Sequence, residues 1–436
     1  MHACGMTRAR PWLAISGAVA ALLLAGLGLL VHGLLPGDEG LAGALAERFE
    51  QLSGIGLKVG AAHWSLRPSP SLVFEELSTM QPQPITVRRV VVHPRLSSLW
   101  HRQVAIDLLE IEGATLPRAS VRAFRGRFEH TDVGAMLAHG WTLAEIPVER
   151  LRLRDAVWID RREIALAYDA DLRFDAHWRP RDGDVEREGA SPPARLRIER
   201  EGDEDRWRTR IDAGGGTWNG STQLQEDDQH RLHLTGQLEA KGVDVGALIR
   251  TFDRRGAVEG RLQGRTELDS EGENPTDLFR HLHTRTRFDV APAALEGFDL
   301  ARAVVSAGVS HGGRTRLDAL AGTLDTHFTD DGPVLRYSGL KARSGALSAS
   351  GSAVVTGRRI DGQVGVDIVD GVVGVPLKVG GTIDRPELSL TGAALTGAAV
   401  GTAVLPGVGT AIGARVGQQV DKLLGGSAGA TKKELR

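Results

Sequence analysis

The sequence predicts a mostly β protein in which a long, curved, largely antiparallel sheet forms an open groove. Apolar and polar residues alternate, between turn-forming clusters, from Ile55 to Leu390. A run from Ile164 to Ala176 places apolar residues at every even position and mostly charged residues at the odd ones. The 55 glycines and the low aromatic content of 5% favour turns and close strand packing over a large helical core. We expect a transmembrane helix before this sheet, few short helices within it and a glycine-rich helical tail after it.

Composition and charge narrow the classes of protein. The chain has 436 residues, of which 41% are hydrophobic and 25% charged, as in folded proteins. Its formal net charge of -2 and the lack of a basic stripe predict no nucleic-acid partner. Cys4 is the single cysteine, so neither an internal disulfide nor a cysteine-based zinc site can form.

The N-terminal segment, residues 1–36, is predicted to be a cytoplasmic N-terminus and a transmembrane anchor. Trp12–Leu35 carries no charged residue and would span about 36 Å as a helix, against roughly 30 Å of hydrocarbon. Arg8 and Arg10 precede this run, which places the preceding side in the cytoplasm and exports the rest. The alternative is a cleaved signal peptide with a small-residue cleavage site at Ala42–Ala44.

An amphipathic helix is predicted over residues 37–54. Asp38 is a suitable N-cap and Gly54 a suitable stop. The spacing of the apolar residues puts them on one face of the helix: Leu41, Leu45, Phe49 and Leu52. That face would pack on the first strands or, alternatively, contact the membrane surface.

The β region is expected to have two parts joined by a charged, proline-bearing linker. We place an N-terminal β region at 55–180, a loop or linker at 181–194 and a C-terminal β region at 195–390. Three short helices are predicted, near Thr131, near Gly242 and at Pro275.

Strands with one apolar face need something to cover that face. Three short helices are too few to do so. A sandwich of two sheets and an open, curved sheet that holds an apolar ligand both remain possible, and we favour the open groove. In that case acyl chains would bury the apolar surface, which is worth roughly 25 cal/mol per Å². The candidate groove-lining residues are Ile164, Leu166, Tyr168, Leu172 and Phe174.

Four stretches of the β region share a recognisable pattern. GLKVGAAHWSLRPSPSLVFEELS and SLWHRQVAIDLLEIEGATL follow the predicted helix, whereas AKGVDVGALIRTFDRRGAVEGRLQGRTELD and GVPLKVGGTIDRPELSL lie in the C-terminal half. Together they resemble the AsmA family of bacterial envelope proteins, the latter two its AsmA-like C-terminal region. The resemblance spans Lys58–Leu116 and Leu232–Leu424, and Pro117–Arg231 carries none of it.

This resemblance implies an inner-membrane anchor, a periplasmic β body with a hydrophobic groove, and similarity to the bridge-like lipid-transfer proteins of the bacterial envelope. The implied function is phospholipid transport and outer-membrane homeostasis. Its partners would be membrane phospholipid, the inner membrane and another envelope protein. A non-enzymatic scaffold for assembling envelope or outer-membrane proteins is the alternative. If about twenty strands stack at roughly 4.8 Å, the groove would be about 100 Å long.

The tail, residues 391–436, is predicted to be helical and rich in small residues. Its glycines recur at intervals of four and would let a second helix approach closely: Gly397 and Gly401, then Gly409, Gly413 and Gly417. A helical hairpin in a bilayer, a pair of helices that plugs one end of the β body, and a second membrane crossing are the three alternatives.

Motifs of enzymes are not evident, so we predict no catalytic residue, no metal and no cofactor. The chain has no Walker loop, no HExxH and no GxSxG motif. His281 and His283 have the spacing of strand-borne metal ligands, but no further ligand is evident nearby. Ser338–Lys341 fits a Ser-x-x-Lys pattern but lies in an alternating strand region rather than at the start of a helix.

Overall fold

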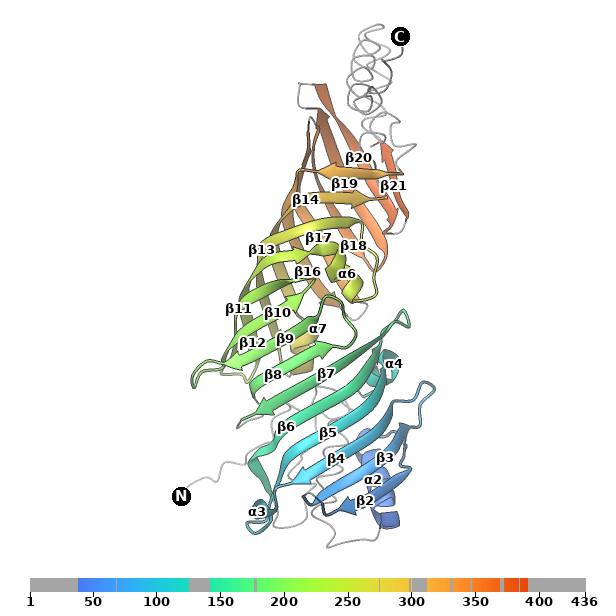
Figure 1. Cartoon of the computed structure of the whole chain (residues 1–436), viewed down its shortest axis with the longest axis vertical. Coiled ribbons are helices and arrows are strands. Elements are labelled where there is room, and N and C mark those ends of the chain that lie inside the picture. The colour runs from blue at the N-terminus through green and yellow to red at the C-terminus, as the bar shows by residue number, and fades with distance from the viewer. Residues whose placement is uncertain are drawn as a thin grey trace, which may run out of the picture.

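All strands in the described part of the chain belong to a single curved sheet, as the alternation predicted (Figure 1). The computed structural model describes residues 38–390 except 68, 125–141, 176–178, 274, 298, 300–311, 330–331, 346, 369–371 and 384. The predicted anchor and the glycine-rich tail, with Gly397, Gly401, Gly409, Gly413 and Gly417, lie outside the described residues. Within the described part of the chain, no helix is both long and apolar enough to cross a bilayer.

The first half of the sheet contains short strands followed by several long ones. Their bounds are β1 Leu57–Lys58, β2 Ala61–Ser65, β3 Ser71–Thr79, β4 Thr86–Pro94, β5 Gln103–Pro117, β6 Thr142–Ile159, β7 Ala165–Phe174, β8 Pro180–Arg187, β9 Ala194–Arg200 and β10 Arg206–Ala213. The second half continues with β11 Gly216–Glu226, β12 Leu232–Asp244, β13 Val258–Gly272, β14 His283–Glu296, β15 Arg314–Leu317, β16 Ala319–Thr329, β17 Gly332–Ser344, β18 Leu347–Thr356, β19 Arg359–Ile368, β20 Val372–Thr382 and β21 Arg385–Leu390.

Few helices accompany the sheet. Those in the described residues are α2 Asp38–Ser53, α3 Leu96–Leu99, α4 Arg118–Arg122, α6 Val245–Thr251 and α7 Pro275–Arg280. Helices α2, α6 and α7 occur where the sequence predicted them. The Asp244 side chain accepts a hydrogen bond from the backbone N–H of Ala247 at 2.6 Å, which explains why α6 begins there. The helix predicted near Thr131 lies outside the described residues.

The strands follow one another through the sheet in chain order, and neighbours are antiparallel at every pairing but one. The exception is the parallel pair β5 and β6, which is joined by the long crossover that parallel pairing requires. Strands β1 and β2 share β3 as a partner, and β15 and β16 share β14, so the 21 strands occupy 19 successive positions across the sheet. At the usual strand spacing these positions extend about 90 Å.

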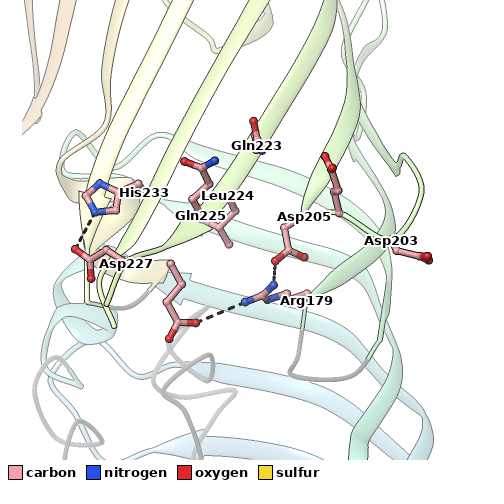
Figure 2. Close-up of a pocket in the computed structure, with 10 residues that line it drawn as sticks. Arg179, Asp203, Asp205, Gln223, Leu224, Gln225, Asp227 and His233 are labelled. Atoms are coloured by element: carbon pink, nitrogen blue, oxygen red, sulfur yellow. Dashed lines mark hydrogen bonds and ion pairs between the residues drawn. The ribbon is translucent and has the colours of Figure 1, made fainter. Parts of the chain in front are cut away.

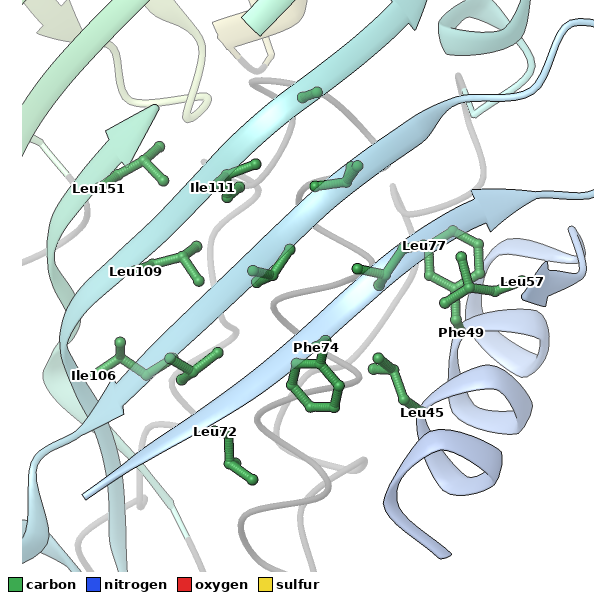
Figure 3. Close-up of a cluster of buried hydrophobic side chains, with 14 of the residues drawn as sticks. Leu45, Phe49, Leu57, Leu72, Phe74, Leu77, Ile106, Leu109, Ile111 and Leu151 are labelled. Carbon is green, nitrogen blue, oxygen red and sulfur yellow. The ribbon is translucent and has the colours of Figure 1, made fainter. Parts of the chain in front are cut away.

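A sealed hydrophobic core fills the N-terminal part of the sheet. Helix α2 lies across its first strands and buries Leu41, Leu45 and Phe49, whose exposed fractions are 2%, 1% and 0%. In Figure 3, Leu45 and Phe49 face Phe74 and neighbouring strand residues. The apolar face of this helix therefore packs on the strands. The cleavage site considered as an alternative, Ala42–Ala44, lies inside α2.

Two boundaries predicted from the sequence were wrong. Residues 181–194 are not a linker, because Pro180–Arg187 forms strand β8 between β7 and β9. Asp182, Asp184 and Glu186 lie on one face, where Asp184 pairs with Arg195, while Val185 and Arg187 lie on the other. The run from Ile164 to Ala176 yields a strand of 10 residues rather than thirteen. It starts at Ala165, because the N–H of Ile164 donates to the Asp160 side chain within a turn.

Candidate functional site

Four of the predicted groove residues occupy one face of β7 and Ile164 directly precedes the strand, but their surroundings differ. Leu166 and Phe174 are buried, with exposed fractions of 8% and 6%, whereas Ile164, Tyr168 and Leu172 are half-buried. Phe174 belongs to the N-terminal core and Leu172 packs against it, so both fill that core. Burial raises the pKa of Tyr168, although the nearby Arg187 acts in the opposite direction.

The same face continues through the C-terminal half of the sheet as four rows of paired residues. We call these rows the inner face. From β12 to β19 they are Gly236, Leu268, Thr284, Thr326, Leu335, Val355 and Ile360; Leu238, Thr266, Thr286, Leu324, Tyr337, Ala353 and Gly362; Ala240, Gly264, Phe288, Gly322, Leu340, Gly351 and Val364; Val243, Leu262, Val290, Leu320, Ala342, Ala349 and Val366. None of these residues is charged, so the inner face is a continuous uncharged surface.

The longer side chains of the inner face are half-buried, although Val243, Val290 and Val366 in the fourth row are sealed, with exposed fractions of 0%, 2% and 2%. From β13 onward every Leu, Ile, Phe and Tyr in the four rows is half-buried, whereas Leu72 and Phe74 in the N-terminal core are 1% and 2% exposed. Burial raises the pKa of Tyr337, although this residue keeps partial solvent access. Protein therefore surrounds Tyr337 on several sides while part of the side chain stays open, as expected on the concave side of a curved sheet.

Glycines allow the sheet to bend toward the inner face. A Cβ added at Gly264 would lie 2.4 Å from the carbonyl oxygen of Arg287, and one at Gly351 would lie 2.3 Å from that of Gln363. At Gly322 the added carbon would meet the side chains of Leu340 at 2.8 Å and Phe288 at 3.3 Å. Any larger residue would push these neighbours apart, so the glycines permit the close approach of backbones that the curvature requires.

Bulges keep apolar residues on the inner face where strict alternation would turn them outward. In β17 the register shifts between Tyr337 and Leu340, and Gly339 takes a left-handed φ of 57° within that bulge. In β12 a similar shift lies between Ala240 and Val243. The extra residue in each bulge resets the alternation. Tyr337 and Leu340 therefore both face inward, and so do Ala240 and Val243.

Two pairs of threonine hydroxyls bond to each other, one on the inner face and one on the strands that precede it. The hydroxyls of Thr266 and Thr286 lie 2.9 Å apart across β13 and β14. The hydroxyls of Thr209 and Thr222 make the same contact between β10 and β11 at 2.9 Å. A paired hydroxyl needs no water partner, so the surface remains suited to an apolar ligand.

Two short helices border the inner face at opposite ends of β12. Helix α7 lies at its start, where Leu278 packs with Trp207, Leu224 and Leu232. Helix α6 follows its end, and Val245 packs against the cluster around Val290. Among the described residues these helices reach only the ends of the strands, so the middle of the inner face has no second layer over it.

The opposite face of the sheet carries the charges. Arg285 donates to Asp325 at 2.7 Å, and Arg314 lies 3.0 Å from Glu259. Burial acts to raise the pKa of Asp325, but the hydrogen bonds and positive charges of Arg285 and His283 together outweigh it, so the pKa is lowered. Such partly exposed ion pairs add little stability, and their charges keep this face of the sheet solvated.

A polar hollow of about 620 Å³ lies beside the ends of β10–β12 (Figure 2). Arg179 forms an ion pair with Asp205 and lies 3.6 Å from Glu226. Asp227 accepts hydrogen bonds from the N–H groups of Arg231 and Gln229 and lies 3.2 Å from a His233 nitrogen. These contacts, led by the backbone bond from Arg231, lower the pKa of Asp227 to about 2. These carboxylates are therefore already bound by side chains and backbone N–H groups at the strand ends. The described residues contain no cluster suited to a metal ion.

The half-buried large side chains of the inner face lie outside the strand singled out from the sequence. Phe288, Leu324 and Leu340 belong to segments whose alternation mixes large residues with Gly, Ala and Thr. That mixture weakens the hydrophobic pattern, although the strands themselves were predicted. The contrast between an uncharged face and a charged face, read across successive strands, is the signal that could have identified them.

Fold and site together define a class of protein in which one extended, curved β sheet presents a long uncharged inner face. No known protein family, curated protein or solved structure matches the chain. Its function therefore has to be argued from the inner face itself.

Proposed function

We propose that the chain is an inner-membrane-anchored periplasmic protein of the AsmA type that binds or conducts lipid acyl chains along the inner face. It would contribute to phospholipid transport and outer-membrane homeostasis. The observation that supports the proposal is the uncharged inner face of β12–β19, on which the Leu, Ile, Phe and Tyr side chains from β13 onward stay half-buried and the middle of the strands meets no helix among the described residues. The charge-free run Trp12–Leu35 supports the membrane location.

The dimensions of the inner face suit a lipid. Strands β12–β19 occupy seven successive positions across the sheet, because β15 and β16 share a partner. At the usual strand spacing the inner face is therefore about 30 Å long. One leaflet of a bilayer is about 15 Å of hydrocarbon, half of the usual thickness. Each methylene transferred from water to this surface would contribute about 0.8 kcal/mol when fully buried.

A scaffold for assembling envelope proteins remains the second candidate. The sealed N-terminal core favours it, because a β body closed on itself would present only its outer surface to partners. The two functions differ in one measurable respect, since only the first places lipid against the inner face.

Photo-crosslinking in living cells tests the proposal with the full-length chain. Tyr337 and Arg336 are neighbours on β17, and Tyr337 lies on the inner face while the exposed Arg336 lies on the other. With p-benzoylphenylalanine at position 337, irradiation should give lipid adducts that mass spectrometry identifies. The same residue at position 336 is the matched control and should give few.

Equal lipid labelling at both positions would point to non-specific contact. Protein adducts alone at position 337 would favour the scaffold. Either outcome would contradict the proposed lipid-binding function.

A further inference from the structure

Three turns that are far apart in the sequence meet at one margin of the inner face. The β6–β7 turn and the β18–β19 turn are joined by a hydrogen bond from Arg162 Nη2 to the carbonyl oxygen of Gly357 at 3.0 Å. The loop after α6 joins them because Arg254 forms an ion pair with Asp160. Arg161 is also close, since its Nη2 would lie 3.9 Å from a Cβ added at Gly357.

Positive charge accumulates where these turns meet. We call Arg161, Arg162, Arg254 and Arg358 the arginine cluster. The pKa of Arg162 is lowered by burial and by repulsion from Arg254, Arg358 and Arg161, against which Asp160 acts in the opposite direction. Asp160 is itself held by the N–H groups of Arg162 and Ile164 at 2.7 and 3.1 Å.

The arginine cluster adjoins the apolar surface. Asp253, next to Arg254, lies 3.1 Å from Arg187, and Arg187 pairs in register with Tyr168 on the apolar face of β7. On the other side, Arg359 begins β19 and the next residue, Ile360, lies on the inner face. An acyl chain on that face would therefore leave its polar end near these arginines.

We propose that the arginine cluster binds a phosphate group, either of a lipid headgroup or of free phosphate. Guanidinium groups present forked donors that match phosphate oxygens, and several of them around one site favour a divalent or diester anion over a neutral group. The headgroup form of this proposal rests on the proposed function. The free-phosphate form does not.

The test uses the full-length protein and two probes. Inorganic phosphate is titrated into purified protein by calorimetry, and lipids crosslinked from position 337 in cells are sorted by mass spectrometry into those with and without phosphate. The test variant is R162Q/R358Q. The matched control is R265Q/R287Q, which removes two exposed arginines that face each other on the outer side of β13 and β14.

For a lipid headgroup, R162Q/R358Q should lower the phosphate-bearing share of the adducts about tenfold, as expected for two lost charged bonds, while R265Q/R287Q leaves it unchanged. For free phosphate, only the calorimetric affinity should fall about tenfold. If neither readout changes in R162Q/R358Q, the proposal is wrong.

The outcomes also separate this proposal from the proposed function. A lack of lipid adducts at position 337 would contradict lipid binding on the inner face. The phosphate titration would still test whether the arginine cluster binds phosphate. Because Arg162 bonds to Gly357, thermal unfolding is measured for each variant. Arg358→Gln alone, at an exposed position, repeats the test if the double variant does not fold.

Discussion

The N-terminal and C-terminal parts of the sheet are built from the same kind of strand but differ in what covers them. In the N-terminal part, α2 lies on the strands and residues such as Leu72 and Ile106 are each 1% exposed. In the C-terminal part, Leu324, Tyr337 and Leu340 are half-buried and only the ends of the strands meet a helix. One sheet thus combines a closed core with an open apolar face.

The difference follows from the residues that occupy equivalent positions. The N-terminal core uses Leu, Ile, Val and Phe with a helix that contributes three buried side chains, Leu41, Leu45 and Phe49. The inner face mixes large residues with Gly, Ala and Thr, so it bends closely without filling the space above it. The lesson is that a strand's alternation predicts an apolar face, whereas the neighbouring element decides whether that face becomes a core or a binding surface.

The largest expected effect comes from placing a charge in each region. Leu45→Asp would bury an unpaired carboxylate in the core, which costs several kcal/mol and should unfold the N-terminal part. Leu324→Asp places the same charge on the half-open inner face and should leave the protein folded while lipid adducts at position 337 are lost. Circular dichroism and crosslinking measure the two effects, and unfolding by Leu324→Asp would contradict the distinction.

Truncation of an aromatic residue in each region gives a smaller effect. Phe49→Ala should lower the free energy of unfolding by about 3–5 kcal/mol, because Phe49 is fully buried and packs edge-to-face on Phe124. Tyr337→Ala should lower it by only about 1–2 kcal/mol, since part of that side chain is open to solvent. Urea denaturation of both variants checks the ratio, and equal losses would mean that the inner face is a closed core.

The curvature of the inner face is tested with glycine substitutions on adjacent strands. Gly351→Ala should destabilise the protein by about 1–3 kcal/mol, because the added carbon would lie 2.3 Å from a backbone oxygen. Gly365→Ala is the matched control, since its nearest neighbour would be 3.9 Å away. Thermal unfolding should rank the two variants in that order, and the reverse order would argue against close strand approach at Gly351.

The smallest effect concerns pH and the polar hollow. The pKa of Asp227 falls from its ordinary value of 3.8 to about 2 in the folded protein. A lowered pKa contributes stability that is present above about pH 4 and is lost as the pH falls toward 2. Asp227→Asn should flatten this loss in urea denaturation curves, whereas Asp228→Asn, at an exposed neighbour, should retain it. If D227N loses stability with falling pH as steeply as the unmodified protein, Asp227 is not the cause of the loss.

Much of the fold was predictable from the sequence because the strands alternate and turn residues separate them. The single sheet, the helix over 37–54 and the helices near Gly242 and Pro275 were predicted from these patterns and are present. Strand β8, within 181–194, was mistaken for a loop or linker, because charged residues suggest solvent, whereas here Asp182, Asp184 and Glu186 form one face of the strand.

The candidate site was harder to predict. Alternation in β7 singled out Leu172 and Phe174, which pack into the N-terminal core, because a single strand carries no information about its neighbours. The bulge at Gly339 also breaks the pattern in β17, so strict alternation would assign Leu340 to the wrong face. The arginine cluster depends on contacts between distant segments, such as the hydrogen bond between Arg162 and Gly357, 195 positions apart, and no local pattern reveals it.

Whether the inner face of β12–β19 holds lipid is best tested by an experimental map of the full-length protein purified from cells. The proposal predicts elongated non-protein density in van der Waals contact with Leu324 and Leu340. Protein side chains filling that space would contradict it and would make the C-terminal part of the sheet a core like the N-terminal one.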